Sequence, residues 1–243
     1  MPNCLKKSLA FTLAETLIVM GIIGVVSALT LPNLNSSTGE KEKIAKVKKI
    51  YQNLNDALER AQVVYGPFDE WTKNDSSGTA GANRIGERMT EFMKVSKNCK
   101  TTTNAGCFPK TTSSSDINDT RADSYTGYRF ITADGQSVII MYDGGSTNLF
   151  MVDINGPNKG SHKFGKDIFV FTLNTATYES KMQGITPMRP SAFSSYFNGI
   201  QSGAYSLGSG WVIDYDNMDY LDADNTGKCK NGTVMNETNP RCK

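Results

Sequence analysis

An almost uninterrupted apolar stretch runs from Phe11 to Leu34 near the start of the chain. Glu15 is the only charged residue within it, and the other residues are mostly apolar, small or hydroxyl-bearing. As a helix, a stretch of this length reaches across the roughly 30 Å hydrocarbon core of a bilayer. The pattern therefore predicts a transmembrane helix over 11–34, which Pro32 should kink because it removes one backbone donor.

A second pattern follows a polar hinge over 35–39. Apolar residues recur three or four positions apart over three heptads, until Gly66 and Pro67 end the pattern. These residues are Ile44, Val47, Tyr51, Leu54, Leu58, Ala61 and Tyr65. The spacing predicts an amphipathic helix over 35–66, whose apolar stripe packs on a globular domain, on neighbouring subunits or on both. If both helices are nearly continuous, they extend for roughly 80 Å at 1.5 Å per residue.

The remaining residues, 67–243, predict a globular α+β domain. Strand-like residues begin at Tyr128, and Gly135 supplies the positive φ of a hairpin turn. The expected elements are a helix over 84–97, an exposed loop over 98–127, two strands around the turn at 133–136, and strands over 149–154 and 168–173. The fold class is therefore α+β, with a long N-terminal helix packed on an antiparallel sheet of about four strands.

The charge balance argues against nucleic acid as a partner. The chain has 26 basic and 24 acidic residues, and two of the basic ones, Lys6 and Lys7, lie in the first ten residues, which hold no acid. The rest of the chain is therefore neutral and lacks the electrostatic footprint of nucleic-acid binding. One local run of lysines is typical of a solvated helix face: Lys41, Lys43, Lys46, Lys48 and Lys49.

The five cysteines favour disulfides over a metal site. Cys4 lies in the basic leader, and the other four form an even set, which outside the cytoplasm indicates disulfides. Three pairings are possible, and the simplest joins neighbours in the sequence across short polar loops. The four residues would then pair as Cys99–Cys107 and Cys229–Cys242. Structural zinc sites favour two to four residues between cysteines, a spacing that neither pair has.

No motif indicates an enzyme. His162 is the only histidine, and it lies in a loop of Gly, Asn and Lys. A single histidine cannot build a multi-histidine metal site, and a Ser-His-Asp arrangement would depend on this loop residue. G-x-S-x-G, H-E-x-x-H and P-loop patterns are absent from the sequence. We therefore expect no catalytic residue and no resident cofactor.

Calcium is the one ion that the sequence could hold, through two groups of oxygen ligands. The second group echoes the first half of an EF-hand loop, but Thr233 stands where the bidentate Glu is needed. The alternative is that these residues form turns in which side chains bond their own backbone, and this reading is favoured. The candidate ligands are Asp153, Asn155 and Asp167 in the first group, and Asp222 and Asp224 in the second.

Two ordinary explanations of the N-terminus fit it incompletely. A secretory signal peptide has a basic start, an uncharged apolar region and an A-x-A-like cleavage site, which Val26-Ser27-Ala28 could imitate. However, Glu15 lies where that region should be uncharged, and the apolar character continues past Ala28. A plain single-pass anchor leaves Glu15 unexplained, although a carboxylate within a membrane is a functional hypothesis by default.

Residues KKSLA-FTLAETLIVMGII resemble the N-terminus of the prepilin family, which includes type IV pilins and the pseudopilins of type II secretion. In that family a dedicated peptidase cuts on the cytoplasmic side just before the Phe, and the new amino terminus is methylated. The resemblance implies cleavage between Ala10 and Phe11, with N-methylation of Phe11. Glu15 falls at the family's assembly glutamate, and Gly24 and Pro32 fall at positions that many members share, which we take as helix kinks. The residue before the cut is usually Gly and is Ala10 here.

The resemblance implies a pilin-like fold and a four-part chain. The expected parts are a leader over 1–10, a transmembrane and assembly helix over 11–34, an amphipathic helix over 35–66, and a globular domain with a C-terminal disulfide loop over 67–243. The chain would stand in the bacterial inner membrane as a single-pass protein, with its globular domain outside the cytoplasm. After assembly it would belong to a periplasmic or cell-surface filament.

The expected function is that of a structural subunit of a type IV pilus or a type II secretion pseudopilus. Its partners would be copies of itself or other pilins, the prepilin peptidase, the assembly platform and the membrane. Glu15 would neutralise the amino terminus of Phe11 across subunits, because an unpaired buried charge is costly. The alternatives are a minor pilin for DNA uptake or adhesion, and an anchored module that binds a ligand or calcium and does not polymerise.

Overall fold

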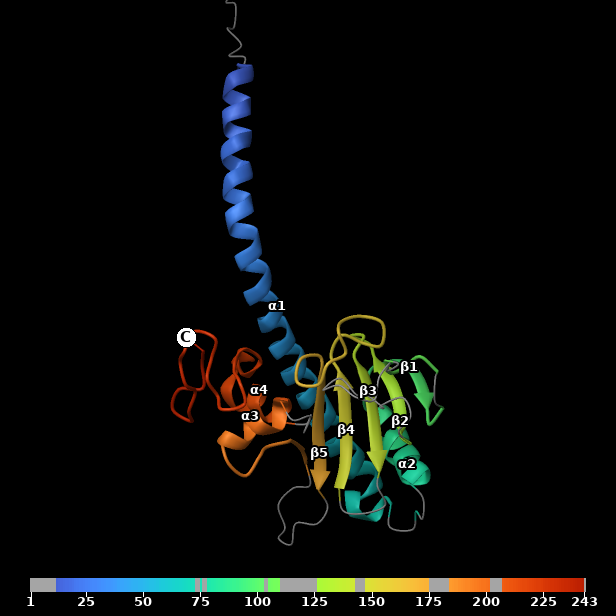
Figure 1. Ribbon diagram of the computed structural model, residues 1–243. Coiled ribbons are helices and arrows are strands. Elements are labelled where there is room, and N and C mark those ends of the chain that lie inside the picture. Colours follow the sequence, from blue (N-terminus) through green and yellow to red (C-terminus); the bar gives the residue numbers. More distant parts are fainter. Residues whose placement is uncertain are drawn as a thin grey trace, which may run out of the picture. The chain divides into compact units, whose positions relative to one another are not determined.

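The computed structural model describes residues 12–72, 75, 78–102, 105–109, 126–142, 147–174, 184–201 and 207–242, with the side chains of 27–38, 147, 174 and 198–201 excepted. The chain divides into two compact units, Met1–Glu42 (unit 1) and Lys43–Lys243 (unit 2). The division falls inside one helix, α1 (Leu13–Tyr65), which contributes to both units (Figure 1).

The unit 2 part of α1 packs through the stripe that its 3–4 spacing predicts. Val47, Leu54 and Leu58 are fully buried, and Tyr51 stacks on the Phe171 ring with 5.5 Å between the ring centroids. This stripe joins the apolar face of the sheet in one continuous core. Burial of an apolar side chain is worth about 1.5–3 kcal/mol, so the stripe accounts for the docking of this helix in unit 2.

The sheet of unit 2 is a six-stranded antiparallel meander, in which each strand pairs with the next along the chain (Figure 1). The strands are β1 (Val95–Lys100), β2 (Tyr128–Thr132), β3 (Ser137–Tyr142), β4 (Thr147–Asp153), β5 (Ile168–Asn174) and β6 (Ile185–Pro187). The β2–β3 hairpin turns at Gly135, whose φ of 83° is the positive value that the turn requires.

The predicted sheet of about four strands is wrong, because the structure adds a strand at each edge. β1 has the sequence VSKNCK, which lacks alternating apolar residues, and its pairing with β2 is irregular at two points. β6 has three residues and ends in Pro187, a residue that edge strands tolerate. Edge strands bury little side-chain area, so they leave a weak signal in the sequence.

Short helices complete unit 2. The helix predicted over 84–97 begins earlier and ends at Thr90, where the chain turns into β1. In α2 the rings of Tyr142 and Tyr128 lie directly over Gly81 and Gly86, where a Cβ atom would collide with them. The helices are η1 (Phe68–Glu70), α2 (Gly78–Thr90), α3 (Ser194–Gln201), α4 (Gly208–Tyr215) and η3 (Asp219–Asp222).

The C-terminal aromatic residues belong to the core. Trp211 is fully buried and lies within 5.3–5.7 Å, between ring centroids, of Tyr196, Phe197 and Tyr220. On the other face of the sheet, a smaller cluster of Ile139, Met151 and their neighbours is buried as well. Tyr196, Phe197, Trp211 and Tyr220 therefore belong to the core cluster that includes the sheet.

The described residues contain two disulfides, and these join the pairs that the sequence favours. Cys99 bonds to Cys107, and Cys229 bonds to Cys242. The first ties the loop after β1 back onto that strand, and the second closes the C-terminal segment. Each bond closes a short loop, with sequence separations of 8 and 13 residues.

Within the described residues, no helix is long and apolar enough to cross a membrane. Spanning a bilayer takes about 20 consecutive apolar residues. The predicted transmembrane segment over 11–34 is therefore wrong, and so are the single-pass anchor and the inner-membrane localisation inferred from it.

The buried stripe of α1 should dominate the stability of unit 2. We expect Leu54→Ala to lower the free energy of unfolding by about 3 kcal/mol, because it leaves a cavity in the core. Urea unfolding followed by the fluorescence of the buried Trp71 and Trp211 measures this loss. Val63→Ala is the matched control on the same helix, since Val63 is 87% exposed, and it should change the value by less than about 0.5 kcal/mol. Equal losses in both variants would contradict this packing.

Candidate functional site

Helix α1 begins with a capping box formed by Thr12 and Glu15. The Glu15 carboxylate accepts hydrogen bonds from the Thr12 backbone N–H and hydroxyl, both at 2.8 Å. In return, the Glu15 backbone N–H donates to the Thr12 hydroxyl at 3.3 Å. This arrangement satisfies donors that are otherwise unpaired at a helix N-terminus.

The cap changes the interpretation of Glu15. The backbone hydrogen bond from Thr12, followed by the bond from its hydroxyl, lowers the pKa of the Glu15 carboxyl. The acid is therefore held ionised at the N-terminal end of the helix, where the helix dipole favours a negative charge. The string Thr-Leu-Ala-Glu is itself a capping-box pattern, so the sequence contains the signal that identifies Thr12 as the N-cap of this helix.

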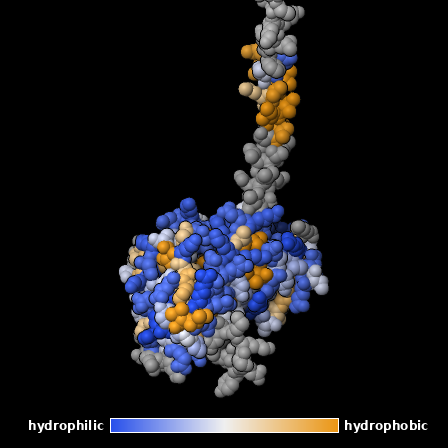
Figure 2. All heavy atoms as spheres, turned by 180° about the vertical axis from the view of Figure 1, so that it is seen from behind, coloured by the Kyte–Doolittle hydropathy of each residue, from blue (hydrophilic) through white to orange (hydrophobic). Residues whose placement is uncertain are grey.

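Beyond this cap, α1 presents a run of exposed apolar side chains. All nine large apolar residues described in this part of the helix are 53–81% exposed. They are Leu13, Leu17, Ile18, Val19, Met20, Ile22, Ile23, Val25 and Val26. Figure 2 shows them as a continuous apolar surface, whereas the visible face of unit 2 is mostly hydrophilic. An apolar surface of this extent marks an interaction site.

The other residues predicted at the N-terminus are described only in part. Ala10 and Phe11, the expected processing site, lie outside the described residues. The helix runs through both Gly24 and Pro32 without a break in its assignment, and nothing lies within 4 Å of a Cβ placed on Gly24. The roles assigned to these four residues stay predictions.

Three lysines of the run on α1, here called the lysine clamp, form ion pairs with unit 2. Lys43 pairs with Asp167 before β5 at 2.8 Å, and Lys48 pairs with Asp216 after α4 at 2.7 Å. Lys49 pairs with Asp134 in the β2–β3 turn at 2.9 Å. The helix is thereby tied to three loops that are distant from one another in the sequence.

The first group of calcium candidates meets in the loop between β4 and β5, here called the carboxylate loop (residues 153–167). Asp153 is fully buried and Asp167 is 1% exposed. Asn155 links the two, because its backbone N–H donates to Asp153 at 2.9 Å and its side-chain amide donates to Asp167 at 2.9 Å. The three residues therefore lie together, as the sequence predicts.

Protein donors surround both carboxylates. The Nδ1 atom of His162 lies 2.6 Å from Asp153 Oδ2. The backbone N–H of Ser161 donates to Asp167 Oδ2 at 3.0 Å, its hydroxyl donates to the same oxygen at 2.5 Å, and Lys43 donates to Oδ1. The chain itself therefore supplies the partners of both acids, the Lys43 ammonium for Asp167 and the His162 ring for Asp153. No pattern in the sequence indicated that Lys43 and Ser161 belong to this cluster.

The two acids respond differently to this environment. Burial raises the pKa of Asp153 to about 6, and the hydrogen bond with His162 opposes this rise. Burial also acts to raise the pKa of Asp167, but the hydrogen bonds from Lys43 and Ser161 outweigh it, so this pKa is lowered. His162 itself takes a left-handed φ of 51°, which is uncommon for a residue other than glycine. The loop holds His162 against Asp153 despite this conformation.

The second group of calcium candidates does not converge on a cation site. One oxygen of Asp224 accepts hydrogen bonds from Thr226 and from the backbone N–H of Lys228, which is the self-bonded turn that the sequence favoured. Asp222 pairs with Lys230 at 2.8 Å. Among the described residues, no group of three or more His, Cys, Asp or Glu side chains is arranged to hold a metal ion.

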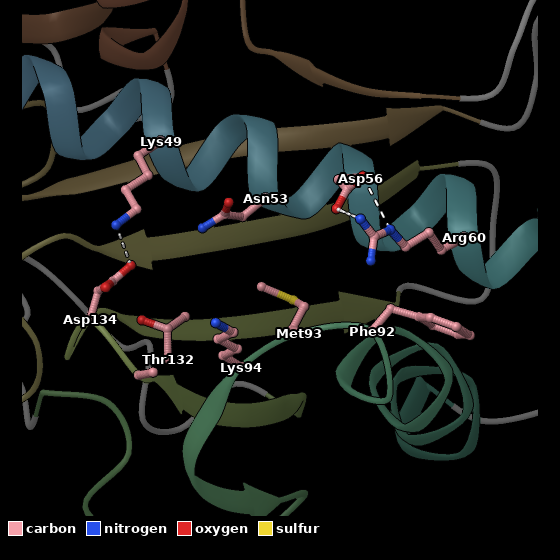
Figure 3. A pocket seen from close by; sticks show the side chains of 10 residues that line it. Lys49, Asn53, Asp56, Arg60, Phe92, Met93, Lys94, Thr132 and Asp134 are labelled. Atoms are coloured by element: carbon pink, nitrogen blue, oxygen red, sulfur yellow. Dashed lines mark hydrogen bonds and ion pairs between the residues drawn. The ribbon is translucent and has the colours of Figure 1, made fainter.

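A groove of about 390 Å³ lies between α1 and the chain that leads into β1 (Figure 3). Its charged residues are largely paired, Lys49 with Asp134 and Arg60 with Asp56. The side chain of Lys94 has no ion-pair partner in the part of the chain that the structure describes. The groove is polar and open, and it contains no nucleophile paired with a base.

Comparison of the chain with protein-family models, with curated proteins and with solved structures finds no match in any of the three.

Removing the imidazole next to Asp153 should destabilise unit 2 in a pH-dependent way. His162→Gln removes the imidazole hydrogen-bond partner of a buried carboxylate, which we expect to cost about 2–3 kcal/mol at ~pH 7.5. The loss should shrink towards ~pH 5, because the raised pKa of Asp153 means that the acid is protonated there and is no longer a buried charge. Urea unfolding at both pH values measures the difference.

Lys163→Gln is the control for this experiment, because it removes an exposed positive charge from the same loop. It should leave stability nearly unchanged at both pH values. A loss for His162→Gln that is equal at the two pH values would show that the Asp153–His162 pair is not the cause.

Proposed function

We propose that the chain is a pilin-like structural subunit, cut between Ala10 and Phe11 and assembled into a type IV pilus or a type II secretion pseudopilus. The observation that carries the proposal is the N-terminal part of α1, which is apolar on all sides, begins at an acidic cap and exposes its large apolar side chains from Leu13 to Val26. The resemblance of residues 6–23 to prepilins supplies the class of assembly.

The exposed apolar side chains give the driving force for assembly. Each is worth about 1.5–3 kcal/mol when it is fully buried. Single exposed apolar residues are normal on a protein surface, whereas nine such residues on one helix indicate an interaction site. Copies of the same helix are suited to cover one another, because helices apolar all round are stable only when they are buried.

Glu15 is the one charge that such a bundle would enclose. Its carboxylate accepts from the Thr12 N–H, so it lies one residue from Phe11. After cleavage, the amino group of Phe11 would be the nearest cation that the chain itself supplies. Pairing the two groups within or between subunits would avoid burying an uncompensated charge.

The ion pairs of the lysine clamp weigh against a DNA-binding role for this helix. Lys43, Lys48 and Lys49 are each engaged by a carboxylate of unit 2. A non-polymerising module would leave the apolar part of α1 uncovered. The structure therefore offers more support for a filament subunit than for either alternative.

A charge within the apolar part of α1 should abolish assembly without unfolding unit 2. We expect Ile18→Asp to prevent filament formation in cells that carry a pilus or pseudopilus assembly system, as judged by electron microscopy. Unit 2 should keep its melting temperature, because Ile18 is 63% exposed and lies in unit 1. Ile18→Leu is the matched apolar control and should assemble. Filaments of normal number from Ile18→Asp would refute the proposal.

Glu15 can be tested for charge and capping separately. Gln is an accepted capping-box residue, so Glu15→Gln keeps an acceptor for Thr12 and removes the charge, whereas Glu15→Ala removes both. We expect both variants to lower filament yield by at least about tenfold, because the amine of Phe11 loses its partner in the bundle. Mass spectrometry should show that the mature chain still begins at Phe11. Normal assembly of Glu15→Gln would reduce the role of Glu15 to capping.

A further inference from the structure

The meander topology sorts the charged loops of unit 2 to two opposite ends. In an antiparallel sheet without crossovers, the start of β1, the β2–β3 turn and the carboxylate loop lie at one end. Helix α1 enters unit 2 at that end, where Lys43 meets Asp167. It reaches the start of β6 at Asn55, whose amide exchanges hydrogen bonds with the backbone of Ile185. Its C-terminus therefore lies at the opposite end (Figure 1).

The first end carries a surplus of positive charge and is here called the basic end. Its acids are already neutralised, since Asp134 pairs with Lys49 and Asp167 pairs with Lys43. Four exposed lysines at this end have no ion-pair partner among the residues that the structure describes. They are Lys94 before β1, and Lys159, Lys163 and Lys166 in the carboxylate loop.

The basic end is held in a defined shape. The buried pair of Asp153 and Asp167 ties the carboxylate loop at both of its termini. Gly156 lies directly against the carbonyl of Gly135, so this loop and the β2–β3 turn form one surface. The Tyr220 hydroxyl donates to the Gly165 carbonyl and fixes the other side of the loop. The fixed conformation of the carboxylate loop therefore holds its lysines in defined positions.

The opposite end carries a surplus of negative charge and is here called the acidic end. Glu59 and Asp69 are exposed and have no ion-pair partner within the described ranges. Glu91 accepts a hydrogen bond from the neutral Tyr65 hydroxyl at 2.5 Å.

The arginines of the acidic end are already engaged. Arg60 pairs with Asp56, and Arg84 pairs with Asp75. Arg88 lies over the rings of Tyr65 and Trp71, 4.8 and 5.2 Å from their centroids. Arg88 keeps its charge, but Glu59, Asp69 and Glu91 outnumber it, so the net charge of this end is negative.

Exposed apolar side chains accompany these acids. Val63 is 87% exposed and Val64 is 60% exposed, next to Glu59 on the last turns of α1. Val63 follows Glu59 by four positions, so the two share a helix face. From Lys43 to Tyr65 the helix extends for about 33 Å at 1.5 Å per residue. The lysines of the carboxylate loop, next to Lys43, therefore lie too far from Glu59 and Asp69 for the two groups to meet within one copy.

We propose that the basic end of one copy binds the acidic end of the next. The occupant of each surface is a second copy of this chain, because the preformed surfaces at opposite ends of one unit carry complementary charges. A contact between two different surfaces does not close on itself and repeats from copy to copy. This inference rests on the proposed filament function, for which it supplies a contact between the folded units.

The contact sets the orientation of neighbours and adds to the apolar helix contact. Exposed charge pairs contribute little affinity individually, but they select the partner surface and speed the encounter. The contact should therefore weaken with salt, whereas burial of the apolar part of α1 should not.

Charge reversal tests the contact. One variant makes the basic end acidic, Lys159→Glu with Lys163→Glu, and the other makes the acidic end basic, Glu59→Lys with Asp69→Lys. The purified full chain is kept in a mild detergent, which covers the apolar part of α1, and association is measured by sedimentation at low and at high salt. Each variant alone should associate at least about tenfold more weakly than the wild type at low salt, because like charges then face each other.

Mixing the two variants is the decisive step. The reversed end of each variant is complementary to the reversed end of the other, so an equimolar mixture should recover association, as should a chain that carries all four substitutions. The matched control, Lys228→Glu with Arg241→Glu, makes the same change of charge in the C-terminal segment and should associate like the wild type. Recovery in the mixture without an effect of the control supports the contact.

The outcomes separate this inference from the proposed function. Wild-type filaments with unchanged association of both reversed variants would overturn the contact and leave the filament function standing. Salt-sensitive association that the mixture restores, together with a wild type that never forms filaments, would retain the contact and remove the filament function. Failure of the mixture to recover, with both variants folded as judged by their melting temperatures, also overturns the contact.

Discussion

The apolar surface of α1 is the constraint on which the rest of the structure depends. From Ile44 to Ala61 the helix is apolar on one stripe, and most of that stripe is buried in the core with the sheet. From Leu13 to Val26 it is apolar all round, and its large apolar side chains are exposed. Folding therefore buries the apolar surface of this 53-residue helix in one part and leaves it exposed to solvent in the other. Association with other chains can bury the exposed part.

Electrostatics complete what the apolar stripe begins. Lys43, Lys48 and Lys49 reach three loops that the stripe alone would not position, and side chains of the chain itself hold the buried acids of the carboxylate loop. Three lysines of the carboxylate loop, Lys159, Lys163 and Lys166, have no ion-pair partner among the described residues, and neither have Glu59 and Asp69 at the opposite end. This separation of charge is the arrangement that a head-to-tail contact requires.

The sequence predicted the elements that bury a regular apolar pattern and missed those that do not. The stripe of α1 and the Gly135 hairpin follow from spacing and turn chemistry, and β4 and β5 lie where apolar runs indicate strands. β1 and β6 bury too little to leave a pattern, and α2 lies several residues earlier than its apolar residues suggested. The partners of Lys43 and Lys48 lie 124 and 168 residues away, so only the folded chain could identify them. The Thr12–Glu15 cap, in contrast, was legible in the sequence.

The proposed filament requires residues 13–26 to become buried between copies. A structure of the assembled filament by electron cryo-microscopy tests this most directly. We expect a filament core in which Leu13 to Val26 of neighbouring copies pack side by side, with Glu15 next to the amino group of Phe11. A filament held together by unit 2 alone, with these side chains exposed to solvent, would contradict it.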